Sequence, residues 1–208
     1  MHCTGRPNFA LIWLLITILT ALPFRISADA TSTKVLSYSA TTTDGGKLAP
    51  GLEVVKRIYG ECVATWSVSA SIDASRCGNE AGTQVFDPCF PGVESMTVLC
   101  PQGGPWATKL VMLRLRTLLM VDYRDGQRRP WERNTYWALE LDGGLRCTAT
   151  PNATSVLNGM RMTYTCVKSS GMANLYGQPD ASSALWRVWV DKPGSTALNR
   201  IAVLKAWR

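Results

Sequence analysis

Histidine is almost absent from this sequence, since His2 is the only one among its 208 residues. His2 also lies in an N-terminal segment that we expect to be removed. The mature chain would then hold no Ser-His-Asp or Cys-His catalytic centre and no zinc site built on histidine. Any catalysis by the mature chain would have to use other groups, such as carboxylates.

The sequence also lacks the common signatures of catalytic and ligand-binding sites. It has no Walker A motif, no G-x-G-x-x-G, no G-x-S-x-G and no EF-hand loop. It has no C-x-x-C, which together with the lack of histidine disfavours a metal site. We therefore predict no catalytic residue, no metal and no cofactor, and we favour a protein that is not an enzyme.

Charged residues are scarce at 18%, although hydrophobic residues make up 46% of the chain and exclude a disordered protein. The formal charge is nevertheless +7. A basic surface attracts anionic lipids, acidic wall polymers or nucleic acid, or it serves only solubility. Because no dense run of Lys and Arg occurs, we expect no nucleic-acid partner.

The N-terminal segment has the three parts of a secretory signal peptide. Met1 to Phe9 carries one arginine and no acid, and Ala10 to Leu22 is an apolar run that Pro23 ends. Small residues follow at Ala28 and Ala30, as a signal peptidase requires. The run is shorter than the roughly 20 residues that span a bilayer. We predict a signal peptide over residues 1–30, cleaved after Ala28 or Ala30; an uncleaved anchor is the alternative.

Beyond the signal peptide, an even number of cysteines remains, which in an exported chain indicates disulfides. Sequence alone leaves many connectivities open, as well as free thiols or a metal site. We predict that neighbours in the chain pair, as Cys62–Cys77, Cys89–Cys100 and Cys147–Cys166.

The mature chain divides into a leader and a folded part. Residues 31–51 are rich in Ser, Thr and Gly and predict a flexible leader, with one short strand near Val35 to Tyr38. Residues 52–208 predict a single β domain, an antiparallel sandwich or barrel, because short β-branched segments alternate with turn residues. Ser69 to Val85 predicts a loop, and Asp87 to Gly92, with two prolines, predicts a turn. The Asn158-Gly159 pair predicts a hairpin.

Asp87 is the most conspicuous acid, because it lies in the string Asp-Pro-Cys-Phe beside a predicted disulfide. Such an aspartate more often holds a turn than acts in catalysis. Paired carboxylates could hydrolyse glycans without histidine. The candidates for such a pair are Asp87, Glu94, Asp122, Asp125, Glu132, Glu140 and Asp142.

One loop combines basic and aromatic residues and is the candidate binding patch; it contains Arg128, Arg129, Trp131 and Arg133. A solvated hairpin tip is the simpler interpretation. Trp186 and Trp189 have an odd spacing, so they should face opposite sides of one strand and one of them could be exposed. Most tryptophans of a small β domain fill its core.

A set of spaced motifs resembles a known group of proteins. It comprises Arg76-Cys77, Asp87-Pro88-Cys89-Phe90, Leu99-Cys100-Pro101, Pro105-Trp106, Trp137-Ala138-Leu139-Glu140-Leu141, Cys147, Gly159-Met160-Arg161, Tyr164-x-Cys166, Leu175-Tyr176-Gly177-Gln178-Pro179-Asp180, Trp186-Arg187-Val188 and Ala206-Trp207. The pattern is similar to that of a secreted bacterial family, of the actinobacterial type and of unknown function. The resemblance implies export and a cysteine framework in the cell envelope or culture fluid, and it implies no catalytic residue.

These observations lead to two hypotheses of function. The first is a secreted, extracytoplasmic binding or structural module of a bacterial envelope. Its partner would be an anionic envelope polymer or another exported protein, and it would have no stable transmembrane segment once the signal is cleaved. The second is a histidine-free secreted hydrolase that acts on glycans with carboxylates.

Overall fold

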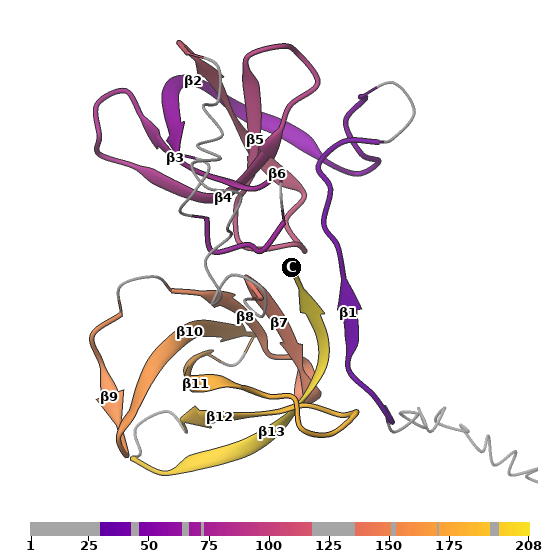
Figure 1. The fold of residues 1–208 in the computed structure, drawn as a ribbon, viewed down its shortest axis with the longest axis vertical. Helices are drawn as coiled ribbons and strands as arrows, with labels where there is room; N and C mark the ends of the chain where they lie inside the picture. The colour runs from indigo at the N-terminus through magenta and orange to yellow at the C-terminus, as the bar shows by residue number, and fades with distance from the viewer. Residues whose placement is uncertain are drawn as a thin grey trace, which may run out of the picture.

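The computed structural model describes residues 30–42, 46–63, 67–71, 73–117, 136–150, 153–169, 171–191 and 196–208. This part of the chain is nearly all β, as the sequence predicts, and it forms two closed barrels (Figure 1). The elements are β1 (Lys34–Leu36), β2 (Glu53–Val63), β3 (Ser75–Asn79), β4 (Val85–Pro91), β5 (Thr97–Pro101), β6 (Lys109–Leu115), β7 (Ala138–Leu141), the 3-10 turn η3 (Asp142–Gly144), β8 (Arg146–Ala149), β9 (Val156–Leu157), β10 (Met160–Lys168), β11 (Gly171–Asp180), β12 (Arg187–Asp191) and β13 (Leu198–Trp207).

The first barrel consists of β2 to β6, each antiparallel to the next in the chain. With an odd number of strands in such a meander, the pair that closes the barrel must be parallel. The closing pair β2–β6 is indeed parallel, from Glu53↔Lys109 to Gly60↔Leu115. Gly60 is needed at this seam, because a Cβ there would lie 2.4 Å from the Gly78 carbonyl oxygen and 2.4 Å from Leu113 Cδ2.

The second barrel follows the order β7-β8-β10-β11-β12-β13 and closes through β13–β7. An even number of strands allows this closing pair to be antiparallel, as observed. The short strand β9 pairs only with β10. The hairpin between them turns at Asn158 and Gly159, both with positive φ, which confirms the hairpin predicted there.

The N-terminal segment predicted as a leader contains β1, which pairs in parallel with the end of β13, Lys34↔Lys205 to Leu36↔Trp207. In Figure 1 this segment runs beside both barrels, and the C-terminus lies between them. Ala40 is fully buried. The segment therefore contributes to the interior of the molecule.

Three hydrophobic clusters hold the structure together. One fills the first barrel and one fills the second. The third lies where the barrels meet and combines Phe90 and Leu110 of the first barrel with Trp137 and Trp207 of the second. The Tyr38 ring of the N-terminal segment joins it, 4.9 Å from Phe90 and 5.4 Å from Trp137 between centroids. The prediction of a single domain over residues 52–208 stays a prediction, since the structure has two barrels with a shared cluster.

Two local predictions are wrong. The loop predicted over Ser69 to Val85 contains β3, and the turn predicted over Asp87 to Gly92 is mostly β4. The sequence of β3 is polar, but Ser75 and Cys77 point inward and are buried. In β4 the prolines leave few ladder partners, so pairing with β5 is limited to Phe90↔Leu99 and Pro91↔Val98. Burial of Cys89 and Phe90 overrides the turn composition.

Candidate functional site

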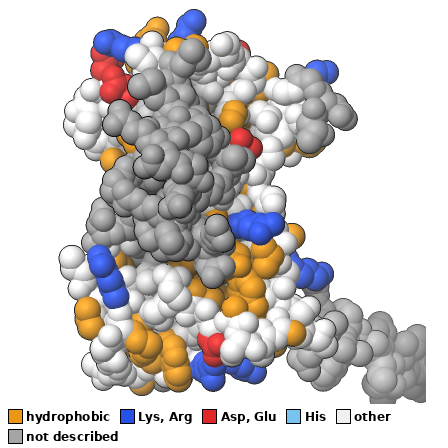
Figure 2. Space-filling view, in the orientation of Figure 1, with side chains coloured by type: hydrophobic (Ala, Val, Ile, Leu, Met, Phe, Trp, Pro, Cys, Tyr) orange, Lys and Arg blue, Asp and Glu red, His pale blue; other side chains and the backbone are white. Residues whose placement is uncertain are grey.

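The binding patch predicted at Arg128, Arg129, Trp131 and Arg133 lies outside the described residues, as do residues 1–29 of the signal peptide predicted over residues 1–30. Among the residues that the structure describes, no helix is long and apolar enough to cross a membrane. On the face seen in Figure 2, Lys and Arg side chains lie singly over both barrels.

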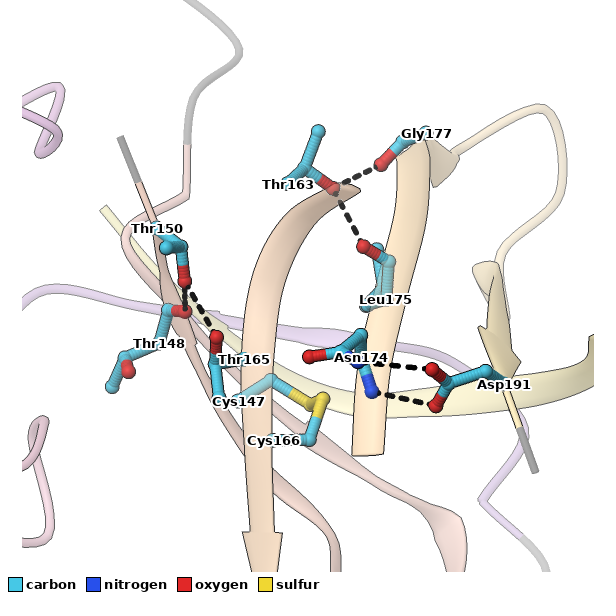
Figure 3. The surroundings of a disulfide bond; sticks show 10 residues. All are labelled: Cys147, Thr148, Thr150, Thr163, Thr165, Cys166, Asn174, Leu175, Gly177 and Asp191. Carbon is cyan, nitrogen blue, oxygen red and sulfur yellow. Dashed lines mark hydrogen bonds between the residues drawn. A yellow bond between two sulfur atoms is a disulfide. The ribbon is translucent and has the colours of Figure 1, made fainter. Parts of the chain in front are cut away.

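The three predicted disulfides, Cys62–Cys77, Cys89–Cys100 and Cys147–Cys166, are all present. Cys62–Cys77 joins register partners of β2 and β3, and Cys147–Cys166 joins register partners of β8 and β10. Around the latter, Asp191 accepts hydrogen bonds from the backbone N–H (2.7 Å) and the Nδ2 (2.9 Å) of Asn174 (Figure 3). These contacts fix neighbouring strands to one another and are structural.

Asp87 fastens a loop to β4. Its Oδ1 accepts hydrogen bonds from Ser67 Oγ (2.8 Å) and from the Val68 backbone N–H (3.0 Å). Its Oδ2 is buried without a hydrogen-bond partner. Burial raises the pKa of Asp87 to about 6, although both hydrogen bonds and the charge of Arg76 act in the opposite direction. Asp87 thus holds a long-range contact, whereas we predicted a local turn.

The described surface is hollowed at one end of the second barrel, next to the turn between β7 and β8. This cleft has a volume of about 400 Å³. Its lining residues are Glu140, Gly144, Arg146, Val167, Lys168 and Ser169. They come from β7, η3, β8 and the end of β10, where Val167 and Arg146 are direct partners across the sheet. The Lys168 ammonium lies over the turn, because a side-chain carbon on Gly143 would be 3.9 Å from it.

Glu140 is engaged by one residue of each barrel. Lys205 of β13 donates to its two oxygens at 3.2 and 3.3 Å. The Trp106 indole N–H, from the β5–β6 turn of the first barrel, donates to Oε2 at 3.3 Å. The pair with Lys205 is partly shielded, because the Glu140 side chain is 22% exposed. Glu140 is therefore suited to positioning its neighbours rather than to general acid catalysis.

Arg146 and Lys168 remain available for a ligand. The Arg146 guanidinium lies 5.4 Å from the centroid of the Trp106 ring, a cation–π arrangement. Neither side chain pairs with a carboxylate within the described part of the chain. Asp142 lies in the adjoining turn, where its Oδ1 accepts a hydrogen bond from the Gly143 N–H. The cleft thus offers two cations that pair with no carboxylate among the described residues, and one of them, Arg146, lies against the Trp106 indole.

A second aromatic and charged group lies on the outside of β12 and β13. Trp189 is 39% exposed, while Trp186 packs against the core of the second barrel, so the two do face opposite sides as predicted. The Arg200 guanidinium lies 5.8 Å from the Trp189 ring centroid and is ion-paired with Asp180. Hydrogen bonds from Ser182 hold the pKa of Asp180 below its usual value. This group is internally neutralised and is a weaker candidate for an anion.

Comparison of the chain with family models, curated proteins and solved structures gives no match. The resemblance to secreted actinobacterial proteins therefore stays a prediction. Sequence reasoning missed the cleft because Trp106, Lys168 and Lys205 are far apart in the chain. Only Glu140 and Arg146, on either side of the predicted turn at residues 142–144, could have been placed together beforehand.

Proposed function

We propose that this protein is an exported, non-enzymatic binding module of a bacterial envelope that holds an acidic polysaccharide in the cleft beside Glu140. Export is supported by the three disulfides, which form and persist in oxidising compartments. The bacterial setting rests on the resemblance described for the sequence.

The observation that carries the proposal is the pair of cations in the cleft, Arg146 and Lys168, which pair with no carboxylate in the described part of the chain. A guanidinium offers a planar set of donors that matches a carboxylate, and an ammonium offers a compact positive charge. The apolar part of the lining is Val167, against which the C–H face of a sugar ring can pack. A polymer that alternates sugar rings with acidic groups presents both features at once.

Glu140 gives the cleft its shape. Because it accepts hydrogen bonds from Trp106 and Lys205, it ties the turn of the first barrel to β7 and β13 of the second.

The test is retention of the purified mature protein on immobilised polygalacturonate, with dextran as the neutral column, over a range of salt concentrations. Arg146→Glu combined with Lys168→Glu should abolish retention on polygalacturonate. Lys47→Glu combined with Lys109→Glu, an equal change of charge at exposed positions away from the cleft, should reduce it only slightly. Equal loss in both double variants would show attraction by net charge alone and would refute the cleft as the site.

The patch predicted from the sequence provides the competing outcome. The partner binds through that patch instead if Arg128→Glu with Arg129→Glu abolishes retention on polygalacturonate while Arg146→Glu with Lys168→Glu leaves it unchanged. If no variant and no wild-type protein is retained at low salt, an acidic polysaccharide is not the ligand. Retention on dextran that survives the cleft substitutions would indicate a neutral glycan elsewhere on the surface.

A further inference from the structure

The first barrel contains an unusual concentration of cysteine sulfur. The Sγ atoms of Cys77, Cys89 and Cys100 all lie within 4.8 Å of one another, although they belong to two different disulfides. All three residues are buried, at 2%, 0% and 1% exposure. A sulfur of one bridge is therefore close to both sulfurs of the next, with no room for a side chain between them.

The two bridges differ in their access to solvent. Cys62 is only partly buried, whereas its partner Cys77 is 2% exposed. The Cys89–Cys100 bridge is enclosed by the hydrophobic cluster that fills the first barrel. A reagent in solution can therefore approach the first bridge through Cys62 but has no direct route to the second.

We propose that these two bridges form one site of thiol–disulfide exchange, in which a dithiol enters at Cys62 and its electrons pass through Cys77 to Cys89–Cys100. A thiolate of the dithiol attacks Cys62 Sγ, forms a mixed disulfide there and releases the Cys77 thiolate. Cys77 then attacks Cys89 or Cys100, forms a new disulfide with it and releases the other as a thiolate.

The exchange needs no oxidant or reductant besides the dithiol. The second thiol of the dithiol resolves the mixed disulfide, so that Cys62 becomes a thiol and the dithiol becomes a disulfide. Two electrons have then entered the protein, and two of the four cysteines of these two bridges are reduced. Apolar surroundings disfavour the Cys77 thiolate and slow the internal step, whereas its proximity to the second bridge favours it.

The Cys147–Cys166 bridge is the internal control. Both of its cysteines are fully buried, as in Cys89–Cys100. No third cysteine among the described residues has its Sγ near this bridge. Without a relay, both buried bridges can be reduced only when their barrels open. With a relay, Cys89–Cys100 should be reduced under native conditions while Cys147–Cys166 persists.

The experiment is limited reduction of the folded mature protein with dithiothreitol, followed by acid quenching, alkylation and peptide mapping by mass spectrometry. We expect molecules with two alkyl groups, one on Cys62 and one on Cys89 or Cys100, and a new disulfide that contains Cys77. The proposal would be overturned if alkylation were confined to Cys62 and Cys77 at every time point, and if Cys89–Cys100 were reduced no sooner than Cys147–Cys166.

A double variant distinguishes the relay from opening of the first barrel, because the two explanations predict opposite changes in the rate at which Cys89–Cys100 is reduced. Removing the first bridge, by Cys62→Ser with Cys77→Ser, should slow the reduction of Cys89–Cys100 at least about tenfold, because the internal nucleophile is lost. Without a relay, the same change would loosen the first barrel and speed the reduction of Cys89–Cys100. If the double variant does not fold, the peptide map of the wild-type protein decides the question alone.

Discussion

Asp87 should make the stability of this protein depend on pH in an unusual direction. Its pKa is raised to about 6 from an ordinary 3.8, because burial penalises the charged carboxylate. The folded state therefore binds the proton more tightly than the unfolded state does. The stabilising contribution of the proton is complete below the unfolded pKa of 3.8 and is lost as pH rises through about 6.

The size of the effect follows from the difference between the two pKa values. At pH 7.5 the carboxyl group is ionised in both states and the proton contributes nothing. At pH 4.5 most folded molecules carry the proton and most unfolded ones do not, so protonation of Asp87 stabilises the fold by about 2 kcal/mol. Asp87→Asn removes this titration while it leaves an oxygen that can accept hydrogen bonds from Ser67 and Val68.

The assay is urea unfolding of both proteins with their disulfides intact, at pH 4.5 and pH 7.5. The free energy of unfolding of the wild type, minus that of Asp87→Asn, should be about 2 kcal/mol greater at pH 4.5. Glu94→Gln, which changes an exposed acid of the same barrel, should show no such difference. If the wild type and Asp87→Asn differ in their free energy of unfolding by the same amount at both pH values, the burial argument is refuted.

Three further changes test the packing of the two barrels by urea unfolding. Gly60→Ala should destabilise the protein by about 1–3 kcal/mol, because the added methyl overlaps the Gly78 carbonyl and Leu113, and a wild-type midpoint would contradict the close β2–β6 seam. Tyr164→Phe removes a 2.6 Å hydrogen bond from the hydroxyl to the Tyr136 carbonyl and should cost about 1–3 kcal/mol, since it leaves that carbonyl without this donor. Replacing both members of Cys147–Cys166 by serine should cost about 3 kcal/mol, because the bridge closes a loop across 19 positions, and an unchanged midpoint would count against the bridge.

The elements that the sequence predicts well are those whose pattern is local. In β6, exposed Arg114 lies between buried Leu113 and Leu115, a period of two that is visible in the sequence. The Asn158-Gly159 hairpin follows from turn chemistry alone. Each disulfide joins cysteines that are neighbours in the chain, and pairing of neighbours is what the sequence predicts, because short loops cost the least entropy to close.

The elements that were missed depend on partners elsewhere in the chain. β11 holds two glycines and a proline, and its inward residues Ala173 and Leu175 are a short apolar pattern. It becomes a strand because β10 and β12 flank it on both sides. The cleft is a similar case, because Trp106 reaches Glu140 only once one barrel has docked on the other.

The junction between the barrels explains why neither barrel is complete without the other. Trp137 is 2% exposed, and its burial requires Tyr38 from the N-terminal segment and Phe90 from the first barrel. Trp207 packs against Trp106 with ring centroids 5.1 Å apart, and Trp106 in turn donates to Glu140. Separating the barrels would expose these aromatic rings to water, at a cost that scales with the apolar area uncovered. Glu140 of the cleft is tied to this junction through Trp106, so the position of its carboxylate depends on the contact between the barrels.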